Sequence, residues 1–249
     1  MKTSFRQGVA KVVGAIVVAA AMVFAVPAAV AGGGQGVTAR GNLNPGVIPN
    51  IGPLYGDLAA DWFQWALSFR KAEVPFFNPG GHVDASLGQQ GHVWFLAGSN
   101  VGPTTRSAEV PTGVALFFPL ANLDNDYPCP DPSFRPDPGE SMEHFLVRTA
   151  QPYLQYMTGL FAAIDGVPVR NPEFYLATSP LFTIDADPAL AQDPVWDPCI
   201  TGTPQPAIAM GYWLLLPPFP PGRHTLHFGS TGWGQDVTYI LNVKPPHGR

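Results

Sequence analysis

Residues 211–243 read GYWLLLPPFPPGRHTLHFGSTGWGQDVTYILNV and hold three strand-like runs separated by turn residues. The runs are Tyr212–Leu216, Arg223–Phe228 and Val237–Val243. Every second residue of the third run is apolar, which is the period of a strand with one buried face. Pro220-Pro221-Gly222 suits a type II turn, because proline presets one φ angle and glycine supplies a positive one. A meander of this size cannot bury its apolar side alone, so upstream strands must form a second layer.

The composition and the upstream sequence favour many short strands. The chain has 27 glycines and 29 prolines, and its 29 aromatic residues (16 Phe, 6 Trp and 7 Tyr) are enough for a core. Both faces are apolar in His92–Ala97 and Val114–Phe118, as expected of central strands that lie between a second sheet and a helix. Asp165-Gly166 is a strong hairpin signal, and Pro168 makes its second arm an edge strand. The sequence therefore predicts a mainly β fold, a two-layer antiparallel β-sandwich for which a jelly roll is one fitting arrangement.

Two helices are expected beside the strands. Leu54 to Lys71 carries aromatic and aliphatic residues at helical spacing, so it predicts one aromatic N-terminal helix. A second helix is expected after Asp137, which can cap it. Pro152 should kink or split this inserted helix near Ala150.

The first 31 residues are typical of a signal peptide. Positive residues precede an uncharged apolar run, Val12–Val26, and Ala29-Val30-Ala31 resembles a cleavage site. The run is shorter than the roughly 20 residues that span a bilayer, which disfavours the alternative of an uncleaved anchor. We therefore expect a signal peptide at 1–31, a flexible tether at 32–53 and a single β-sandwich domain at 54–249. The mature protein is expected to be secreted or periplasmic, with no transmembrane anchor.

Two cysteines would then meet an oxidising compartment. A disulfide between Cys129 and Cys199 would close a loop of 70 residues (199 − 129). On the chain-entropy model, such a crosslink stabilises a fold by roughly 4 kcal/mol. Free thiols or a metal-binding pair are the alternatives, but neither cysteine has a histidine or a second cysteine at ligand spacing.

The charge balance disfavours nucleic acid as a partner. Three of the 13 basic residues lie in the leader, so the mature chain has 10 against 18 acidic residues, a net charge of −8. Such a surface repels phosphate backbones, and no basic patch alternates with aromatic residues.

A ligand-binding function is predicted from polar residues beside the apolar strands. The candidates are Gln89, Trp94, Asn122 and Asp124, because amides and carboxylates can hydrogen-bond a sugar while an aromatic ring stacks on it. The alternative is that these residues end strands and satisfy loop backbone. We expect a non-catalytic binding or envelope-associated module, with a carbohydrate or another extracellular polymer as its partner.

Metal and cofactor sites are not predicted. His224 and His227 fall on opposite faces of one strand, so they cannot share an ion. We interpret His224 as a hydrogen-bonded core histidine, and His92, also interpreted as inward-facing, would meet it only if their strands were neighbours. Asp124, Asp126 and Asp131 are expected in one loop, where a surface calcium site competes with simple solvation of the carboxylates.

Catalysis has weaker support than binding. The chain contains no G-x-S-x-G motif for a nucleophilic serine. A secreted hydrolase using paired carboxylates stays open as an alternative, because the separation of such a pair is a property of the fold. Its candidate members are Asp61, Glu143, Asp165 and Asp236. A structural or protein-interaction domain is a third hypothesis, suggested by the low charge content of 12%.

Several stretches together resemble a family of uncharacterised bacterial secreted proteins that carry signal peptides. The stretches are DWFQWALS, GQQGHVWFLAG, VPTGVALFFPLAN, AIDGVPV, SPLF and GYWLLLPPFPPGRHTLHF, in this order along the chain. The resemblance covers nearly the whole mature chain. It implies an exported domain and no particular activity.

Overall fold

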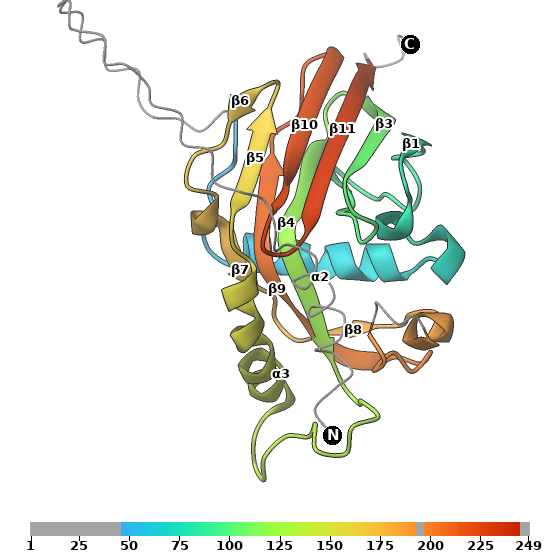
Figure 1. Cartoon of the computed structure of the whole chain (residues 1–249), viewed down its shortest axis with the longest axis vertical. Coiled ribbons are helices and arrows are strands. Elements are labelled where there is room, and N and C mark those ends of the chain that lie inside the picture. The colour runs from blue at the N-terminus through green and yellow to red at the C-terminus, as the bar shows by residue number, and fades with distance from the viewer. Residues whose placement is uncertain (1–45, 193–196, 245–249) are drawn as a thin grey trace, which may run out of the picture.

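The computed structural model describes residues 46–192 and 197–244. The predicted signal peptide and the first part of the predicted tether lie outside these residues. Within them the chain forms two β-sheets, two α-helices and short 3-10 helices (Figure 1). None of the described helices is long and apolar enough to cross a membrane. The disulfide between Cys129 and Cys199 is present, as predicted.

Sheet A has six strands and sheet B has four strands in a row, with a fifth strand, β8, paired to β9. The strands of sheet A are, in spatial order, β1 (Gly81–Val83), β3 (Thr104–Pro111), β11 (Gln235–Lys244), β10 (Gly222–Ser230), β5 (Leu160–Ile164) and β6 (Val167–Pro168). Those of sheet B are β2 (Val93–Phe95), β4 (Ala115–Asp126), β9 (Gln205–Leu216) and β7 (Leu176–Thr178), with β8 (Phe182–Ile184) beside β9. The helices are α2 (Leu54–Leu67) and α3 (Met142–Ala150), and the 3-10 helices are Lys71–Glu73, Pro75–Phe77, Gln151–Tyr156, Pro172–Tyr175 and Pro188–Gln192.

The β-sandwich is confirmed, but its sheets are mixed rather than purely antiparallel. The predicted three-stranded meander is only partly right: β10 is antiparallel to β11, but the first run, Tyr212–Leu216, lies in β9 of sheet B. However, β1 is parallel to β3, β3 is parallel to β11, and β2 is parallel to β4. Long connections separate these partners in the sequence, and a long connection allows either direction of pairing. Strand direction was therefore not readable from the local sequence.

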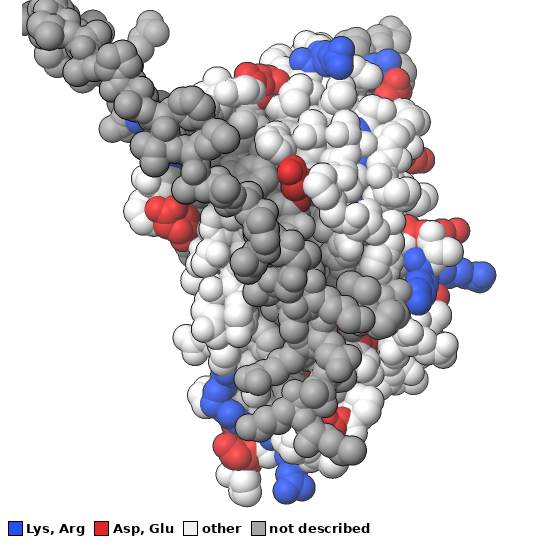
Figure 2. All heavy atoms as spheres, viewed as in Figure 1, with Lys and Arg blue, Asp and Glu red and all other residues white. Residues whose placement is uncertain are grey.

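Sheet B lies between sheet A and helix α2, as the two-faced apolar strand predicted. Phe118 of β4 points towards sheet A, where its ring lies 4.4 Å from that of Phe228. The adjacent Phe117 points to the other side and stacks on Trp213, with 5.1 Å between ring centroids. The ring of Tyr55 of α2 packs edge-on against Phe117. Its hydroxyl accepts a hydrogen bond from the backbone N–H of Leu215 in β9. The aromatic face of α2 is therefore part of the core. Charged side chains are few in this chain, and they are scattered over the face of the molecule shown in Figure 2.

Strand β2 is an edge strand of three residues, which corrects its prediction as a central strand. Its outer edge carries the side chain of Gln89, which binds the backbone of Phe95 twice. The Gln89 amide nitrogen donates to the Phe95 carbonyl, and the Phe95 N–H donates to the Gln89 amide oxygen, each at 2.8 Å. A side chain rather than a strand therefore satisfies this part of the sheet edge.

Helix α3 covers the part of sheet B that extends beyond sheet A (Figure 1). Ser141, not the predicted Asp137, is its N-cap and accepts a bond from the His144 N–H. The split before Pro152 is confirmed, since the α-helix ends at Ala150 and a 3-10 helix continues it. The predicted hairpin at Asp165-Gly166 is also confirmed, with β6 at the edge of sheet A.

Strand β4 runs eight residues further than predicted, to Asp126. Residues 122–126, expected to begin a loop, instead continue the antiparallel pairing with β9 beyond a register shift between Pro119 and Ala121. Asp124 lies opposite Ala209 and Asp126 opposite Ala207. Both aspartates point away from α3, because the intervening Asn125 binds the Leu146 carbonyl of that helix.

Candidate functional site

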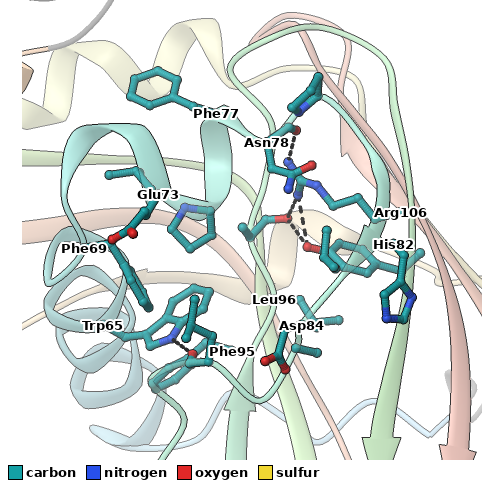
Figure 3. Close-up of a pocket in the computed structure, with 18 of the residues that line it drawn as sticks. Trp65, Phe69, Glu73, Phe77, Asn78, His82, Asp84, Phe95, Leu96 and Arg106 are labelled. Carbon is teal, nitrogen blue, oxygen red and sulfur yellow. Dashed lines mark hydrogen bonds between the residues drawn. The ribbon is translucent and has the colours of Figure 1, made fainter.

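An aromatic cavity of about 310 Å³ lies between the end of α2, the strand β1 and the strand β2 (Figure 3). Figure 3 shows Trp65, Phe69 and Phe95 on one side of it, with His82 and Arg106 on the other. The ring of Trp65 lies 5.9 Å from Phe69 and 5.7 Å from Phe95, and its Nε1–H donates to the Leu87 carbonyl. The volume of the cavity is at the lower end of the range of roughly 300–1,000 Å³ found for small-molecule binding sites. We call it the aromatic cavity.

Glycine allows the chain to pass close over this aromatic wall. Gly88 has a φ angle of +67°, and a Cβ atom there would lie 2.8 Å from the Phe69 ring and 3.2 Å from Trp65. Any other residue would be strained at this φ and would push on the wall. The glycine of the GQQG segment therefore shapes the cavity.

Polar side chains accompany the aromatic wall. Glu73, Asn78, His82 and Asp84 all line the cavity. The pKa of the Asp84 carboxyl is lowered, because the hydroxyl and the backbone N–H of Ser86 both donate to it. Asp84 is therefore a fixed, ionised acceptor. An aromatic wall with several hydrogen-bonding groups can hold a flat, polar molecule.

Arg106 is buried behind the cavity and holds its walls together. Only 1% of this residue is exposed, and its guanidinium donates to the carbonyls of Ala97, Gly98 and Asn78 and to the Tyr239 hydroxyl. No carboxylate of residues 46–192 and 197–244 forms an ion pair with it. Arg106 thus ties three backbone segments around the cavity through neutral acceptors.

The four residues predicted to bind a ligand do not form one site. Gln89 is engaged with the backbone of Phe95, and Trp94 is half-buried on β2 against the core. Asn122 and Asp124 lie on β4, where Asp124 is only 6% exposed. Gln89 does not line the aromatic cavity, but it is hydrogen-bonded to Phe95, which forms part of the wall. The cavity residues come from several short elements between Trp65 and Arg106, with Tyr239 added from β11, and only the GQQG turn and the aromatic helix were signals for them in the sequence.

The histidines are hydrogen-bonded, but not to one another. The His224 ring lies 2.7 Å from the Asp165 carboxylate and 3.0 Å from the Pro220 carbonyl, so the prediction of a hydrogen-bonded histidine holds. His227, on the other face of β10, contacts Asp236 at 2.9 Å. His92 is exposed beside the edge of sheet B, which corrects its prediction as inward-facing. It therefore does not meet His224 of sheet A.

A second group of polar residues is buried at the end of β4, beside the segment that carries Cys199. Asp124, Asp126 and Asp197 are at most 6% exposed, and we call them the carboxyl cluster. Gln205 donates its amide N–H to Asp126 at 2.6 Å and to the Cys199 carbonyl at 3.0 Å. Asp197 accepts the Cys199 N–H at 2.7 Å, so the cluster is built against the disulfide.

The electrostatics of the carboxyl cluster follow from this burial. Burial raises the pKa of Asp124, and the nearby Asp197 raises it further. Burial likewise raises the pKa of Asp126, with Asp197 and Asp124 adding to the effect, and burial raises the pKa of Asp197. The expected loop cluster with Asp131 is wrong, since Asp131 is exposed and binds Ser133. The alternation Asn122, Asp124, Asp126 was the available signal of a polar strand face.

Comparison with protein-family models, with curated proteins and with solved structures gives no match to this chain. The resemblance to a family of bacterial secreted proteins therefore stays an expectation.

Proposed function

We propose that the chain is a secreted, non-catalytic binding module that holds a carbohydrate or another extracellular polymer in the aromatic cavity. The observation that carries the proposal is the pairing of an aromatic wall with hydrogen-bonding groups around one space of about 310 Å³. Sugar rings present C–H groups on their faces and hydroxyls at their edges. Trp65 and Phe69 offer apolar surface for the faces, and Glu73, Asn78 and Asp84 offer acceptors and donors for the hydroxyls.

The preformed geometry supports binding without a large rearrangement. Arg106 and Gln89 fix the backbone around the cavity through several hydrogen bonds. A site that is already ordered loses less conformational freedom when a ligand enters. Rigid walls of this kind suit a binding module.

Export is part of the proposal and has separate support. Disulfides persist in oxidising compartments, and Cys129 and Cys199 are joined. The leader-like first 31 residues point in the same direction.

The alternative of a secreted hydrolase is favoured by one feature, the two carboxyl groups of Glu73 and Asp84 in the cavity. A glycosidase needs a carboxylic acid whose raised pKa lets it donate a proton. Among the described residues, the carboxyls with raised pKa are Asp61, Asp124, Asp126 and Asp197, and these do not line the cavity. Asp84 has a lowered pKa. Binding is therefore the better-supported function.

The test is a glycan-binding panel followed by calorimetry on any hit. Phe69→Ala should weaken binding about threefold to tenfold, corresponding to roughly 0.6–1.4 kcal/mol for one ring contact. Phe174→Ala is the matched control, because Phe174 is 72% exposed and lies outside the cavity. Equal affinities for both variants, or a panel without binding, would contradict the proposal. Turnover of a bound glycan that is lost in Glu73→Gln would instead favour the hydrolase.

A further inference from the structure

The wall of the aromatic cavity is rich in π-electron surface. Trp65, Phe69, Phe77 and Phe95 all line the cavity, and each of these side chains is half-buried rather than enclosed in the core. The faces of aromatic rings carry a partial negative charge and attract cations, and tryptophan does so most strongly. A positively charged group would therefore gain an attraction from these rings that a neutral group would not.

Two carboxylates border the same space. Glu73 and Asp84 line the cavity, both are exposed, and Figure 3 shows them on two sides of the group of rings. Neither of them forms an ion pair with a lysine or an arginine among residues 46–192 and 197–244. Both donors of Ser86 bind Oδ1 of Asp84, which leaves Oδ2 to accept from a ligand. These carboxylates can therefore neutralise a cation that the rings attract.

Arg106 is the cavity residue whose charge would oppose a cation. Its Nη atoms already donate to three backbone carbonyls and to the Tyr239 hydroxyl. Its Nε–H has no acceptor among the described residues, but this atom is buried too, so a ligand in the cavity would not reach it. With His82 counted as neutral, the lining residues carry two negative charges and one positive charge, a net charge of −1 (−2 + 1). The whole chain is also negative, with a formal net charge of −5, so its field favours a cationic ligand over an anionic one.

We propose that the sugar unit that enters the aromatic cavity is an amino sugar with a free, protonated amino group. This inference rests on the proposed function and narrows the ligand from carbohydrates in general to cationic ones. The C–H groups of such a unit can stack on Trp65 and Phe69. Its ammonium group can donate hydrogen bonds to the carboxylates of Glu73 and Asp84. An N-acetylated unit lacks the charge, and a uronate would bring a negative charge towards two carboxylates.

The experiment compares three hexasaccharides that share a β-1,4-linked backbone and differ in charge. The hexamers of glucosamine, N-acetylglucosamine and glucose are titrated calorimetrically into the purified chain at about pH 6, where the free sugar amine is protonated. We expect the glucosamine hexamer to bind about tenfold more tightly than either neutral hexamer. Raising the NaCl concentration from about 50 to 500 mM should weaken the binding of the glucosamine hexamer severalfold, because salt screens charges at exposed sites.

Variants separate the cavity from a general attraction between a polycation and an acidic protein. Glu73→Gln and Asp84→Asn each remove one charge from an exposed side chain with little change of shape. Each should weaken binding of the glucosamine hexamer at least threefold, and by a larger factor than binding of the neutral hexamers. Glu173→Gln makes the same charge change at an exposed residue outside the cavity and should bind like the wild type.

The possible outcomes judge this inference separately from the proposed function. A neutral hexamer that binds as tightly as the glucosamine hexamer would overturn the assignment of an amino sugar and leave a carbohydrate-binding module standing. Equal losses in Glu173→Gln and in the two cavity variants would overturn it as well, because the attraction would not be local. A chain that binds none of the three hexamers would also overturn it, and the wider glycan panel then decides the proposed function on its own.

Discussion

The aromatic cavity and the carboxyl cluster both contain aspartate, but they shift the pKa of its carboxyl in opposite directions. Asp84 at the cavity is exposed, is bound by Ser86 and has a lowered pKa. Asp126 is fully buried beside two other carboxyls and has a raised pKa. The residue type is the same, so burial and neighbours decide whether the carboxyl stays an ionised acceptor or keeps its proton. The two regions should therefore respond very differently to equally small changes.

The largest effect is expected from loss of the disulfide beside the carboxyl cluster. Cys129→Ala combined with Cys199→Ala frees a 70-residue loop in the unfolded chain and should lower the free energy of unfolding by roughly 4 kcal/mol. The aromatic cavity has no such crosslink, so glycan affinity of the folded fraction should stay unchanged. Urea unfolding and calorimetry at low temperature measure the two quantities. A stability loss below about 1 kcal/mol would show that the chain-entropy account fails here.

Two glutamines provide a finer comparison. Gln205 is 3% exposed and bridges Asp126, Cys199 and Thr201, whereas Gln89 is half-buried and binds only Phe95. Gln205→Ala should destabilise by about 3 kcal/mol, because it leaves several buried groups without partners. Gln89→Ala should cost only about 1 kcal/mol, since water can replace the amide at a sheet edge. Urea midpoints of the two variants decide, and equal losses would refute the argument from burial.

A hydrogen-bonded carboxylate outside both regions should respond to pH with a definite sign. Arg148 and the backbone N–H of Asp137 bind the Glu140 side chain and lower its pKa from 4.5 to about 2. A lowered pKa stabilises the fold above the unfolded value, and this contribution is lost as the pH falls from about 4.5 to 2. Glu140→Gln should therefore be less stable than the wild type at pH 7, with the difference vanishing near pH 2. Thermal melts across this pH range test it, and a constant difference would contradict it.

The smallest effect on stability is expected at the cavity. Asp84→Asn keeps the shape of the side chain and changes only an exposed charge, so its free energy of unfolding should stay within about 0.5 kcal/mol of the wild type. Glycan affinity should nevertheless fall, because an ionised acceptor is replaced by a neutral amide. A matched pair of melting curves and titrations separates the two readouts. A destabilised variant with full affinity would reverse the roles given to the two regions.

The sandwich was predictable because local signals agreed with the final packing. The period of Val237–Val243 and the Asp165-Gly166 turn specify their strands without help from elsewhere. The run from Asn122 to Asp126 has the composition of a loop, and only its pairing with the long strand β9 makes it a strand. For the same reason the carboxyl cluster was missed, since Asp197 joins it from a distant segment.

The aromatic cavity was beyond prediction for a related reason. Its wall comes from α2, from Phe69 just after that helix and from β2. Its polar groups lie in or next to β1 and two 3-10 helices, and Arg106 reaches it from β3. Parallel pairing of β3 with β11 brings Arg106 beside Tyr239, and no local pattern encodes that neighbour. The aromatic spacing in α2 predicted a buried helix correctly, but not that Trp65 and Phe69 would border an open space.

The pair of hydrogen bonds between the Gln89 amide and the backbone of Phe95 has one more consequence. A free outer strand invites a neighbouring molecule to add its own backbone, and such stacking is how many β proteins aggregate. Here the amide already occupies the N–H and C=O groups that a visiting chain would need. In sheet A, the edge strand β6 contains Pro168, which has no backbone N–H to offer to an added strand. Strand addition is therefore disfavoured at one edge of each sheet, at β2 and at β6.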